Sequence, residues 1–304
     1  MNKKVLIVLL ALLIVAFTLT LKFFSSSSSV DNTLQQDKET ACLDTLYFDK
    51  ESFDQDIAKA QDYQADTISA GIVPHHLLAG ELIASFFKTV NATEKGIDTV
   101  VIIGPNHKGS GADISLADCG WQTQFGTLTC DDDIVKNILS CSTLAARADN
   151  ELIETDHAAS DLIPYAKYYL PDAKVVTILL SRQVTLQQTE DMAEVLAAQG
   201  NDKKILVVGS IDFSHGLSVE EGKKRDEGTL AAINHHDLAA IKKMSNEHLD
   251  SPETLCTLLS YMKISANTIP SLLDHKNAAD YLNRSQVEEC TTYFVFTCQN
   301  DTLS

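Results

Sequence analysis

Val100-Val101-Ile102-Ile103-Gly104-Pro105-Asn106-His107 is the stretch that sets the expected fold. Four β-branched apolar residues in a row predict a strand that is buried on both faces, and the Gly-Pro pair ends it abruptly. His107 follows directly after this break. Strands buried on both faces belong to parallel sheets that helices cover, so this stretch predicts a sheet at the centre of the protein.

The same pattern occurs twice more along the chain. The run 68–74 leads to His75, and the run 205–214 leads to His215. In open α/β sheets, ligands bind just beyond the carboxyl ends of the strands. Three strands that each end near a histidine therefore predict one shared site that contains His75, His107 and His215.

Strands and helices are expected to alternate along the rest of the chain. Apolar runs predict further strands at 174–180 and 291–298, and helical spacing of apolar residues predicts helices at 77–90, 187–198, 219–233 and 252–262. The expected fold class is therefore α/β, with a central, mostly parallel sheet and helices on both faces. We place this single domain at residues 61–304.

The charge of the chain excludes one class of partner. The formal net charge of the 304 residues is −18. Nucleic-acid binding requires clusters of Lys and Arg that neutralise phosphates, so no nucleic-acid partner is expected.

Residues 1–24 are expected to be a membrane anchor. A basic head with Lys3 and Lys4 precedes an apolar run from Val5 to Leu21, which is long enough to span a membrane. The lysines would keep the N-terminus in the cytoplasm, so the domain would lie outside the cytoplasmic membrane. The alternative is a signal peptide that is cleaved within residues 25–29, which would release a secreted protein. Residues 25–60 are expected to be a polar tether and an N-terminal extension.

Seven cysteines in an exported domain predict disulfides. The best candidate pair is Cys119 and Cys130, because they flank a segment around Trp121 that predicts a β-hairpin and would bring its ends together. Cys290 and Cys298 lie too far apart within one predicted strand to bond to each other.

The residues beside the histidines indicate the chemistry of the site. Asp156 precedes His157 at the start of a predicted helix, and Asp212 lies three residues before His215. Imidazoles with nearby carboxylates suit iron, copper or zinc better than calcium or magnesium, and the carboxylates can orient the ring nitrogens. Without a metal, His157 and Asp212 could instead act as a general acid and base on a bound ligand.

Five motifs of this chain resemble, in order, those of the Memo family, also called AmmeMemoRadiSam system protein B. They are Pro74-His75, Gly104-Pro105-Asn106-His107, the hairpin motif Trp121 to Gly126, Asp156-His157 with Pro164-Tyr165, and Ser210-Ile211-Asp212-Phe213-Ser214-His215. The resemblance extends from about residue 65 to the C-terminus. The chain departs from the family pattern at His76-Leu77, where the family has Ala-Gly, and at Ser160, where it has Glu.

The resemblance implies the fold of the extradiol dioxygenases that use non-haem iron, and a copper or iron site with redox roles. By position, it implies that His75 and His107 are metal ligands and that His157 is a further ligand or an acid–base group. Ser214 stands where animal members have a cysteine ligand. Because a hydroxyl is a poorer ligand than a thiolate, the third ligand would come from His157, His215, Asp212 or water.

Two functions from different classes follow from these observations. The first is a metal-binding oxidoreductase that uses iron or copper, with zinc as a further candidate metal. The second is a non-catalytic binding module that recognises a small molecule or a peptide in the pocket at the strand ends. Hydrolysis by Ser214, His215 and Asp212 is disfavoured, because residues this close in sequence do not easily form a nucleophile–base relay.

Overall fold

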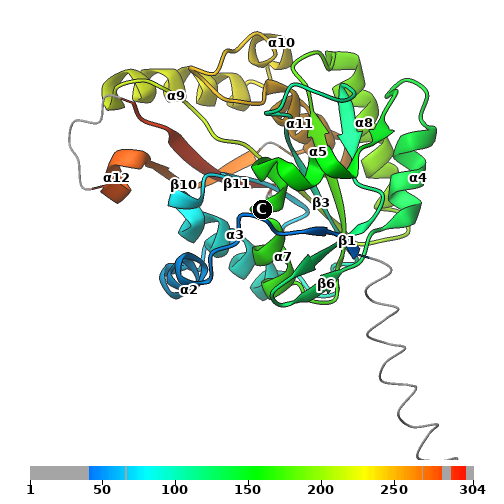
Figure 1. Ribbon diagram of the computed structural model, residues 1–304. Coiled ribbons are helices and arrows are strands. Elements are labelled where there is room, and N and C mark those ends of the chain that lie inside the picture. Colours follow the sequence, from blue (N-terminus) through cyan, green and yellow to red (C-terminus); the bar gives the residue numbers. More distant parts are fainter. Residues whose placement is uncertain (1–40, 66, 269, 283–288, 299–304) are drawn as a thin grey trace, which may run out of the picture. The chain divides into compact units, whose positions relative to one another are not determined.

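A mixed sheet of eight strands forms the centre of the computed structural model, which describes residues 41–65, 67–268, 270–282 and 289–298 (Figure 1). In spatial order the strands are β10 (Pro270–Asn277), β11 (Thr292–Cys298), β2 (Ala70–Val73), β9 (Ile205–Ser210), β3 (Thr99–Pro105), β8 (Lys174–Leu180), β4 (Ile114–Leu116) and β7 (Arg147–Ala148). The stretch that predicts a buried strand is β3, every residue of which is buried.

Parallel pairing joins the four central strands of this sheet and, at one edge, β4 and β7. β2, β9, β3 and β8 are parallel neighbours. β4 runs antiparallel to β8, and β11 runs antiparallel to both β2 and β10. The α/β class is confirmed, and the sheet is mixed, with its parallel centre at the strands that precede His75 and His107.

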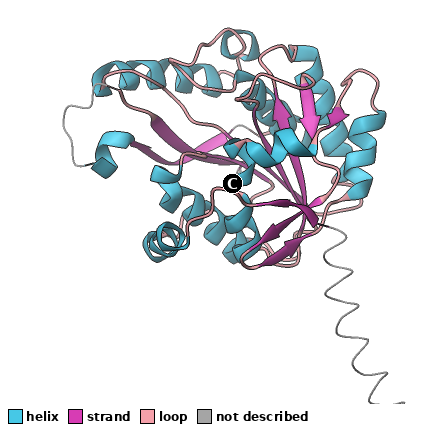
Figure 2. Ribbon diagram, viewed as in Figure 1, coloured by secondary structure: helices cyan, strands magenta, loops and turns pink. Residues whose placement is uncertain are grey.

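Helices cover both faces of the sheet, as predicted (Figures 1 and 2). The helices α3 (Gly80–Thr93) and α7 (Ile163–Tyr169) lie on one face, and α4 (Asp132–Ser140), α8 (Leu186–Gln199) and α11 (Pro252–Ala266) lie on the other. Alternate residues of β3 point to opposite faces, so Val100 and Ile102 belong to one core cluster and Val101 and Ile103 to the other.

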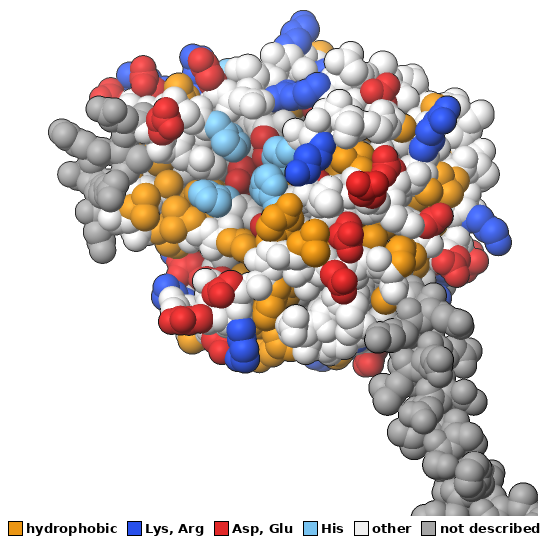
Figure 3. Space-filling view, in the orientation of Figure 1, with side chains coloured by type: hydrophobic (Ala, Val, Ile, Leu, Met, Phe, Trp, Pro, Cys, Tyr) orange, Lys and Arg blue, Asp and Glu red, His pale blue; other side chains and the backbone are white. Residues whose placement is uncertain are grey.

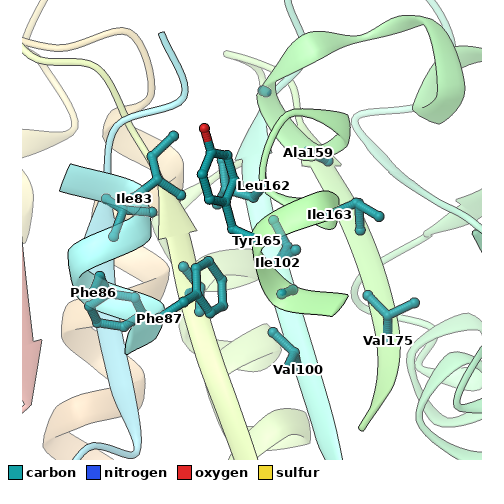
Figure 4. Packing of buried hydrophobic residues seen from close by; sticks show 14 of the residues in the cluster. Ile83, Phe86, Phe87, Val100, Ile102, Ala159, Leu162, Ile163, Tyr165 and Val175 are labelled. Carbon is teal, nitrogen blue, oxygen red and sulfur yellow. The ribbon is translucent and has the colours of Figure 1, made fainter. Parts of the chain in front are cut away.

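The first of these clusters packs α3 and α7 against the central strands (Figure 4). Its labelled members in Figure 4 include Ile83, Phe86 and Phe87 of α3 and Ile163 and Tyr165 of α7. This packing fixes the start of α7. The short helix α6 (His157–Ser160) comes just before α7, and it lies against β3 and β8.

A second, three-stranded sheet has the order β1-β5-β6. β1 spans Ala41–Asp44, and β5 (Gly120–Thr123) and β6 (Gly126–Leu128) form the predicted hairpin around Trp121. The helix α2 (Lys50–Lys59) follows β1. The compact unit begins at Cys42, so it includes α2 and all of β1 except Ala41.

The predicted disulfide between Cys119 and Cys130 is wrong, because Cys119 bonds to Cys42 of β1. Beyond Leu128 the chain leaves the hairpin and follows β8. The Thr129 carbonyl accepts a hydrogen bond from Val175, and the Val175 carbonyl accepts one from Asp131. Cys130 therefore pairs with Val175 instead of facing Cys119.

The remaining helices complete the surface. They are η1 (Leu77–Ala79), α5 (Asn150–Thr155), α9 (Val219–Asn234), α10 (Leu238–Ile241) and α12 (Ala278–Leu282). Among the described residues, no helix combines the length and the apolar character that a membrane span requires. The predicted anchor at 1–24 lies outside the described residues.

Candidate metal centre

Three histidines converge beyond the carboxyl ends of the parallel strands at the centre of the sheet, where β9 separates β2 from β3. His75 follows β2, His107 follows β3, and His157 begins α6. One donor nitrogen from each ring lies within 4.8 Å of the others. Histidine side chains gather on one face of the protein in Figure 3. The third histidine of this group is His157, and His215 is not a member.

His75 is buried, and its hydrogen bonds fix which nitrogen carries a proton. The Ser210 hydroxyl donates its single hydrogen to the Ala158 carbonyl. It therefore accepts a hydrogen bond from His75 Nδ1, which lies 3.0 Å away. His75 Nε2 then faces Oδ2 of Asp250 at 3.2 Å and Oδ2 of Asp212 at 3.6 Å.

The two carboxylates determine the charge of the His75 ring. Burial lowers the pKa of His75, but Asp212 and Asp250 outweigh it and raise the pKa to about 9. In the metal-free protein His75 is thus a cation paired with these carboxylates. A metal ion that binds at Nε2 must replace this proton.

His107 is oriented by the buried carboxylate of Asp156. Oδ2 of Asp156 accepts the backbone N–H of His107 at 2.8 Å, and Oδ1 lies 2.9 Å from His107 Nδ1. A carboxylate only accepts hydrogen bonds, so Nδ1 carries the hydrogen and Nε2 keeps a free lone pair. Burial raises the pKa of Asp156, but the hydrogen bonds from His107 and Ala158 hold it below its usual value. A carboxylate that fixes an imidazole in this way is typical of a metal-binding histidine.

His157 lies against both other rings. It stacks on His107 with ring centres 4.3 Å apart and planes 15° apart, and it meets the edge of His75 at 5.2 Å. Burial and the charges of His75 and His107 lower the pKa of His157 to about 4. Its imidazole is therefore neutral near pH 7, which is the form that binds metals.

Asp250 brings a carboxylate between two of the histidines. Its Oδ2 lies 3.2 Å from His75 Nε2 and 3.9 Å from His107 Nε2. Its Oδ1 is buried and has no hydrogen-bond partner among the described residues. Burial raises the pKa of Asp250, but the nearby His75, His215 and His107 lower it by more than burial raises it. The pKa is therefore below its usual value, and the carboxylate stays ionised. A buried anion with an unpaired oxygen is stabilised by a bound cation.

The donor atoms fit a transition-metal ion. His75, Asp212 and Asp250 form a second group of donor atoms within 4.8 Å of one another, and it shares His75 with the histidine group. Imidazole nitrogens with carboxylate oxygens suit iron, copper and zinc. Two of the three rings have their Nδ1 hydrogen fixed by Ser210 or Asp156, which leaves Nε2 for a metal.

Asp212 holds the segment that carries His75. Its Oδ1 accepts the backbone N–H of His75 at 3.1 Å and that of His76 at 3.5 Å. The ring of His76 lies outside the histidine group, with Nδ1 2.6 Å from the Tyr293 hydroxyl. The sequence made Asp212 a candidate acid–base residue. In the structure it positions the backbone of His75, and its negative charge stabilises the positive charge of the His75 ring.

Ser214 and His215 take other roles in the structure. The buried Ser214 hydroxyl donates to Oδ1 of Asp226 at 2.7 Å, so its hydrogen is committed to a residue of α9. His215 is half-buried and donates its backbone N–H to the Asn246 carbonyl at 3.1 Å. His215 belongs to neither group of convergent donor atoms. We therefore do not retain either residue as a proposed ligand.

Asp250 lies among the donor atoms of the site, but the sequence did not predict it as a site residue. It follows no strand of the central sheet and lies in a turn just before Ser251, the N-cap of α11. Its backbone N–H donates to the Asp212 carbonyl at 3.1 Å, and this contact brings it to the histidines. The only local signal was the Ser-Pro helix start, which places a turn there but says nothing of a carboxylate's surroundings.

The fold and the site define an α/β protein with a histidine–carboxylate cluster at the ends of its parallel strands. The chain belongs to the Memo family, because residues 48–291 match the family described as Memo-like protein. This finding confirms the resemblance that the sequence motifs indicated.

Several curated relatives carry the name "MEMO1 family protein". The Methanobrevibacter smithii protein is 29% identical over 188 residues, which is 61% of this chain and 64% of that protein. The Pyrobaculum aerophilum protein is 26% identical over 58% of this chain and 64% of its own length. The Metallosphaera sedula protein is 26% identical over 69% of this chain and 76% of its own length. The chain thus spans less than two thirds of the first two relatives.

One solved structure is similar in fold. It is described as the crystal structure of the uncharacterized protein JW3007 from Escherichia coli K12, and it aligns with a TM-score of 0.52 and 14% sequence identity. The alignment covers 76% of this chain and 99% of that chain. At this level of identity the similarity concerns the fold alone.

Proposed function

We propose that this Memo-family protein is a metal-dependent oxidoreductase that binds iron or copper, with zinc as a further candidate metal, through His75, His107 and His157. The observation that carries the proposal is the convergence of three imidazole nitrogens within 4.8 Å beside an ionised carboxylate. A bound iron or copper ion would supply redox chemistry that none of the side chains provides.

The surrounding residues have separate roles in this proposal. Ser210 and Asp156 hold hydrogens on Nδ1 of His75 and His107, so that Nε2 of each ring is the donor atom. Asp250 offers a carboxylate oxygen and balances positive charge. His157 is neutral near pH 7 and lies at the rim of the cluster, so its ring is available as the third ligand. Its alternative role, to accept a proton from a substrate, is disfavoured by its pKa of about 4.

The location of the domain is part of the proposal. The basic head and apolar run at residues 1–21 support an anchor that places the domain outside the cytoplasmic membrane, with cleavage and secretion as the alternative. The bond between Cys42 and Cys119 supports the same location, because disulfides persist in oxidising compartments.

A non-catalytic binding module remains the second candidate function. The observation that favours it is a cavity of about 460 Å³ beside the histidines, which is lined by residues other than the proposed ligands. Its volume falls in the range of small-molecule sites.

Anaerobic metal titration of the full-length protein tests the proposal. Fe(II), Cu(II) and Zn(II) are added separately, unbound ions are removed, and bound metal is counted by mass spectrometry. We expect about one ion per chain in the wild type and loss of most of it in His107→Ala. The matched control is His235→Ala, since His235 is exposed, its Nδ1 lies 2.7 Å from the Ala231 carbonyl, and it belongs to neither group of convergent donor atoms.

The two candidate functions give different outcomes in the next step. Oxygen uptake with a chemical reductant by the iron- or copper-loaded protein, absent from the zinc-loaded protein, supports the oxidoreductase. Wild-type metal content in a folded His107→Ala variant would refute the site. Metal binding without any redox turnover would favour the binding module.

A further inference from the structure

The cavity beside the histidine cluster has its own chemistry. It is lined by α2 and the loop before it, by η1, by the junction of α6 and α7, and by α12. Tyr47 links it to the cluster. Tyr47 lines the cavity, its ring meets His157 edge-on at 6.5 Å, and its hydroxyl donates to the Thr155 carbonyl at 2.8 Å.

Asp161 places a carboxylate in this cavity, and among the described residues this carboxylate has no hydrogen-bond partner. Its side chain is only 8% exposed and lines the cavity. Among the described residues, none makes a hydrogen bond or an ion pair with its carboxylate. Burial raises the pKa of Asp161 to about 7, and the nearby Asp212 and Asp156 add to this while His75 opposes it. A carboxylate placed this deeply in the cavity loses most of its hydration, and a cation bound beside it would offset that loss.

The second buried carboxylate of the cavity is already satisfied. Asp56 is 9% exposed, and its Oδ2 accepts the Tyr165 hydroxyl at 2.7 Å. The Tyr165 ring packs in the core with its hydroxyl directed out of the cluster (Figure 4). By contrast, the Tyr281 hydroxyl, in the same cavity, is buried and has no hydrogen-bond partner among the described residues. Asp161 and Tyr281 are therefore two polar groups deep in the cavity that are available to a ligand.

The walls of the cavity are aromatic. The Phe53 ring lies 5.5 Å from that of Phe48 and 4.8 Å from that of Tyr165, and Tyr47 and Tyr281 also line the cavity. Aromatic faces attract organic cations, most strongly where water is excluded. Hydrophobic side chains lie next to the histidines on the face that Figure 3 shows.

The charges that line the cavity are mostly negative. Asp49, Asp56 and Asp161 line it, and Lys59 is the one basic side chain among the described residues that do so. Lys59 is exposed, so its charge is solvated, whereas Asp56 and Asp161 are buried. This arrangement disfavours an anionic ligand and favours a cationic one.

We propose that this cavity binds an organic cation, a protonated amine or a quaternary ammonium group on an apolar body. The charged head meets Asp161, the apolar body lies against Phe48 and Phe53, and the Tyr281 hydroxyl accepts a hydrogen bond where the head is a protonated amine. Two kinds of ligand present this group: a small-molecule amine, and a peptide through the ammonium group of a lysine side chain. The inference does not depend on a bound metal, and it names a ligand class for the binding module.

Calorimetric titration of the full-length, metal-free protein at pH 8, above the pKa of about 7 of Asp161, tests this inference. The probe is the 2-phenylethylammonium ion, and the comparison compounds are neutral 2-phenylethanol and anionic 3-phenylpropionate. Acetyl-lysine-amide, with its free side-chain amine, tests the peptide source. We expect the ammonium probe to bind at least about tenfold more tightly than the alcohol and the anion, because only it pairs with the carboxylate.

Asp161→Asn removes the charge at nearly constant volume and should weaken the ammonium probe about tenfold to a hundredfold, without weakening 2-phenylethanol. The matched control is Asp172→Asn, an exposed carboxylate outside the cavity, which should leave both affinities unchanged. Equal binding of cation, alcohol and anion by the wild type would overturn the inference without any variant. Repeating the titration with zinc-loaded protein keeps a failure here distinct from a failure of the metal site.

Discussion

The strongest prediction concerns Asp156, whose carboxylate fixes the proton of His107. Asp156 accepts three hydrogen bonds, from the backbone and Nδ1 of His107 at 2.8 and 2.9 Å and from the Ala158 N–H at 3.0 Å. In Asp156→Asn, one carboxylate oxygen becomes an amide that donates. If this amide faces Nδ1, the His107 hydrogen must move to Nε2, where it blocks the metal. If the amide faces the backbone N–H of His107, both groups are hydrogen-bond donors, and neither has an acceptor.

The expected loss follows from these contacts. Changing a residue that orients a metal ligand typically costs tenfold to a hundredfold in metal affinity, or about 1.4–2.7 kcal/mol. The metal-free protein should lose about 1–2 kcal/mol in its free energy of unfolding, because one buried hydrogen bond is replaced by an unpaired group.

Competition titration against a chromophoric chelator measures this affinity, and urea unfolding measures the stability. The control is Asp149→Asn, because Asp149 caps α5 through the Leu152 N–H at 3.1 Å and contacts no histidine. Asn caps helices as well as Asp, so this variant should keep both values. A metal affinity of Asp156→Asn within about twofold of the wild type would refute the role of Asp156 in orienting His107.

Three further predictions follow from other parts of the structure. The pKa of His75 is raised from 6.5 to about 9, so its ion pair stabilises the metal-free fold fully below about pH 6.5 and is lost as the pH rises through about 9. Metal must displace this proton, so metal affinity should rise about tenfold per pH unit between about pH 7 and 9. Cys42→Ser opens the bond to Cys119, which spans 77 residues, and should lower the free energy of unfolding by about 2–4 kcal/mol. Gly71→Ala would place a Cβ 2.2 Å from the Phe86 ring and 2.8 Å from a backbone oxygen, so it should destabilise the protein by about 1–3 kcal/mol.

Each of these three has a measurement and a contradicting result. A metal affinity that does not change with pH would show that His75 binds no proton that competes with the metal. Urea unfolding of Cys141→Ser, which removes a thiol outside the disulfide, should match the wild type, and equal loss in both cysteine variants would contradict the role of the bond. Gly228 of α9 has open space at its Cβ, so Gly228→Ala should be neutral or stabilising. Equal stability of the two glycine variants would contradict the packing of Phe86 against β2.

Much of the fold could be predicted from the sequence, because apolar runs and helical spacing are local signals. The stretch at Val100 to Ile103 identified the central strand, and the turn residues around Trp121 identified the hairpin. The antiparallel pairs on either side of the parallel centre were not predicted, because pairing direction depends on which distant strand a segment meets. For the same reason the partner of Cys119 came from β1, far away in the sequence.

The site could be predicted in part. His75 and His107 follow strands of the parallel centre of the sheet, and that topology alone brings their segments together. His157 and Asp250 reach the cluster from a helix start and a turn, whose positions depend on packing over the sheet. Ser214 shares the local pattern of a strand-end residue, yet its hydroxyl bonds to Asp226 of α9. Local sequence specifies where a segment ends, and tertiary packing decides which way its side chains point.

X-ray absorption spectroscopy of the iron- or zinc-loaded protein tests the metal centre most directly, because it counts the imidazoles bound to the ion. We predict two or three imidazole ligands in the wild type, no sulfur ligand, and one imidazole fewer in His107→Ala if that variant is loaded with excess metal. A spectrum with oxygen ligands only, or one that is identical in the wild type and His107→Ala, would contradict a metal site formed by His75, His107 and His157.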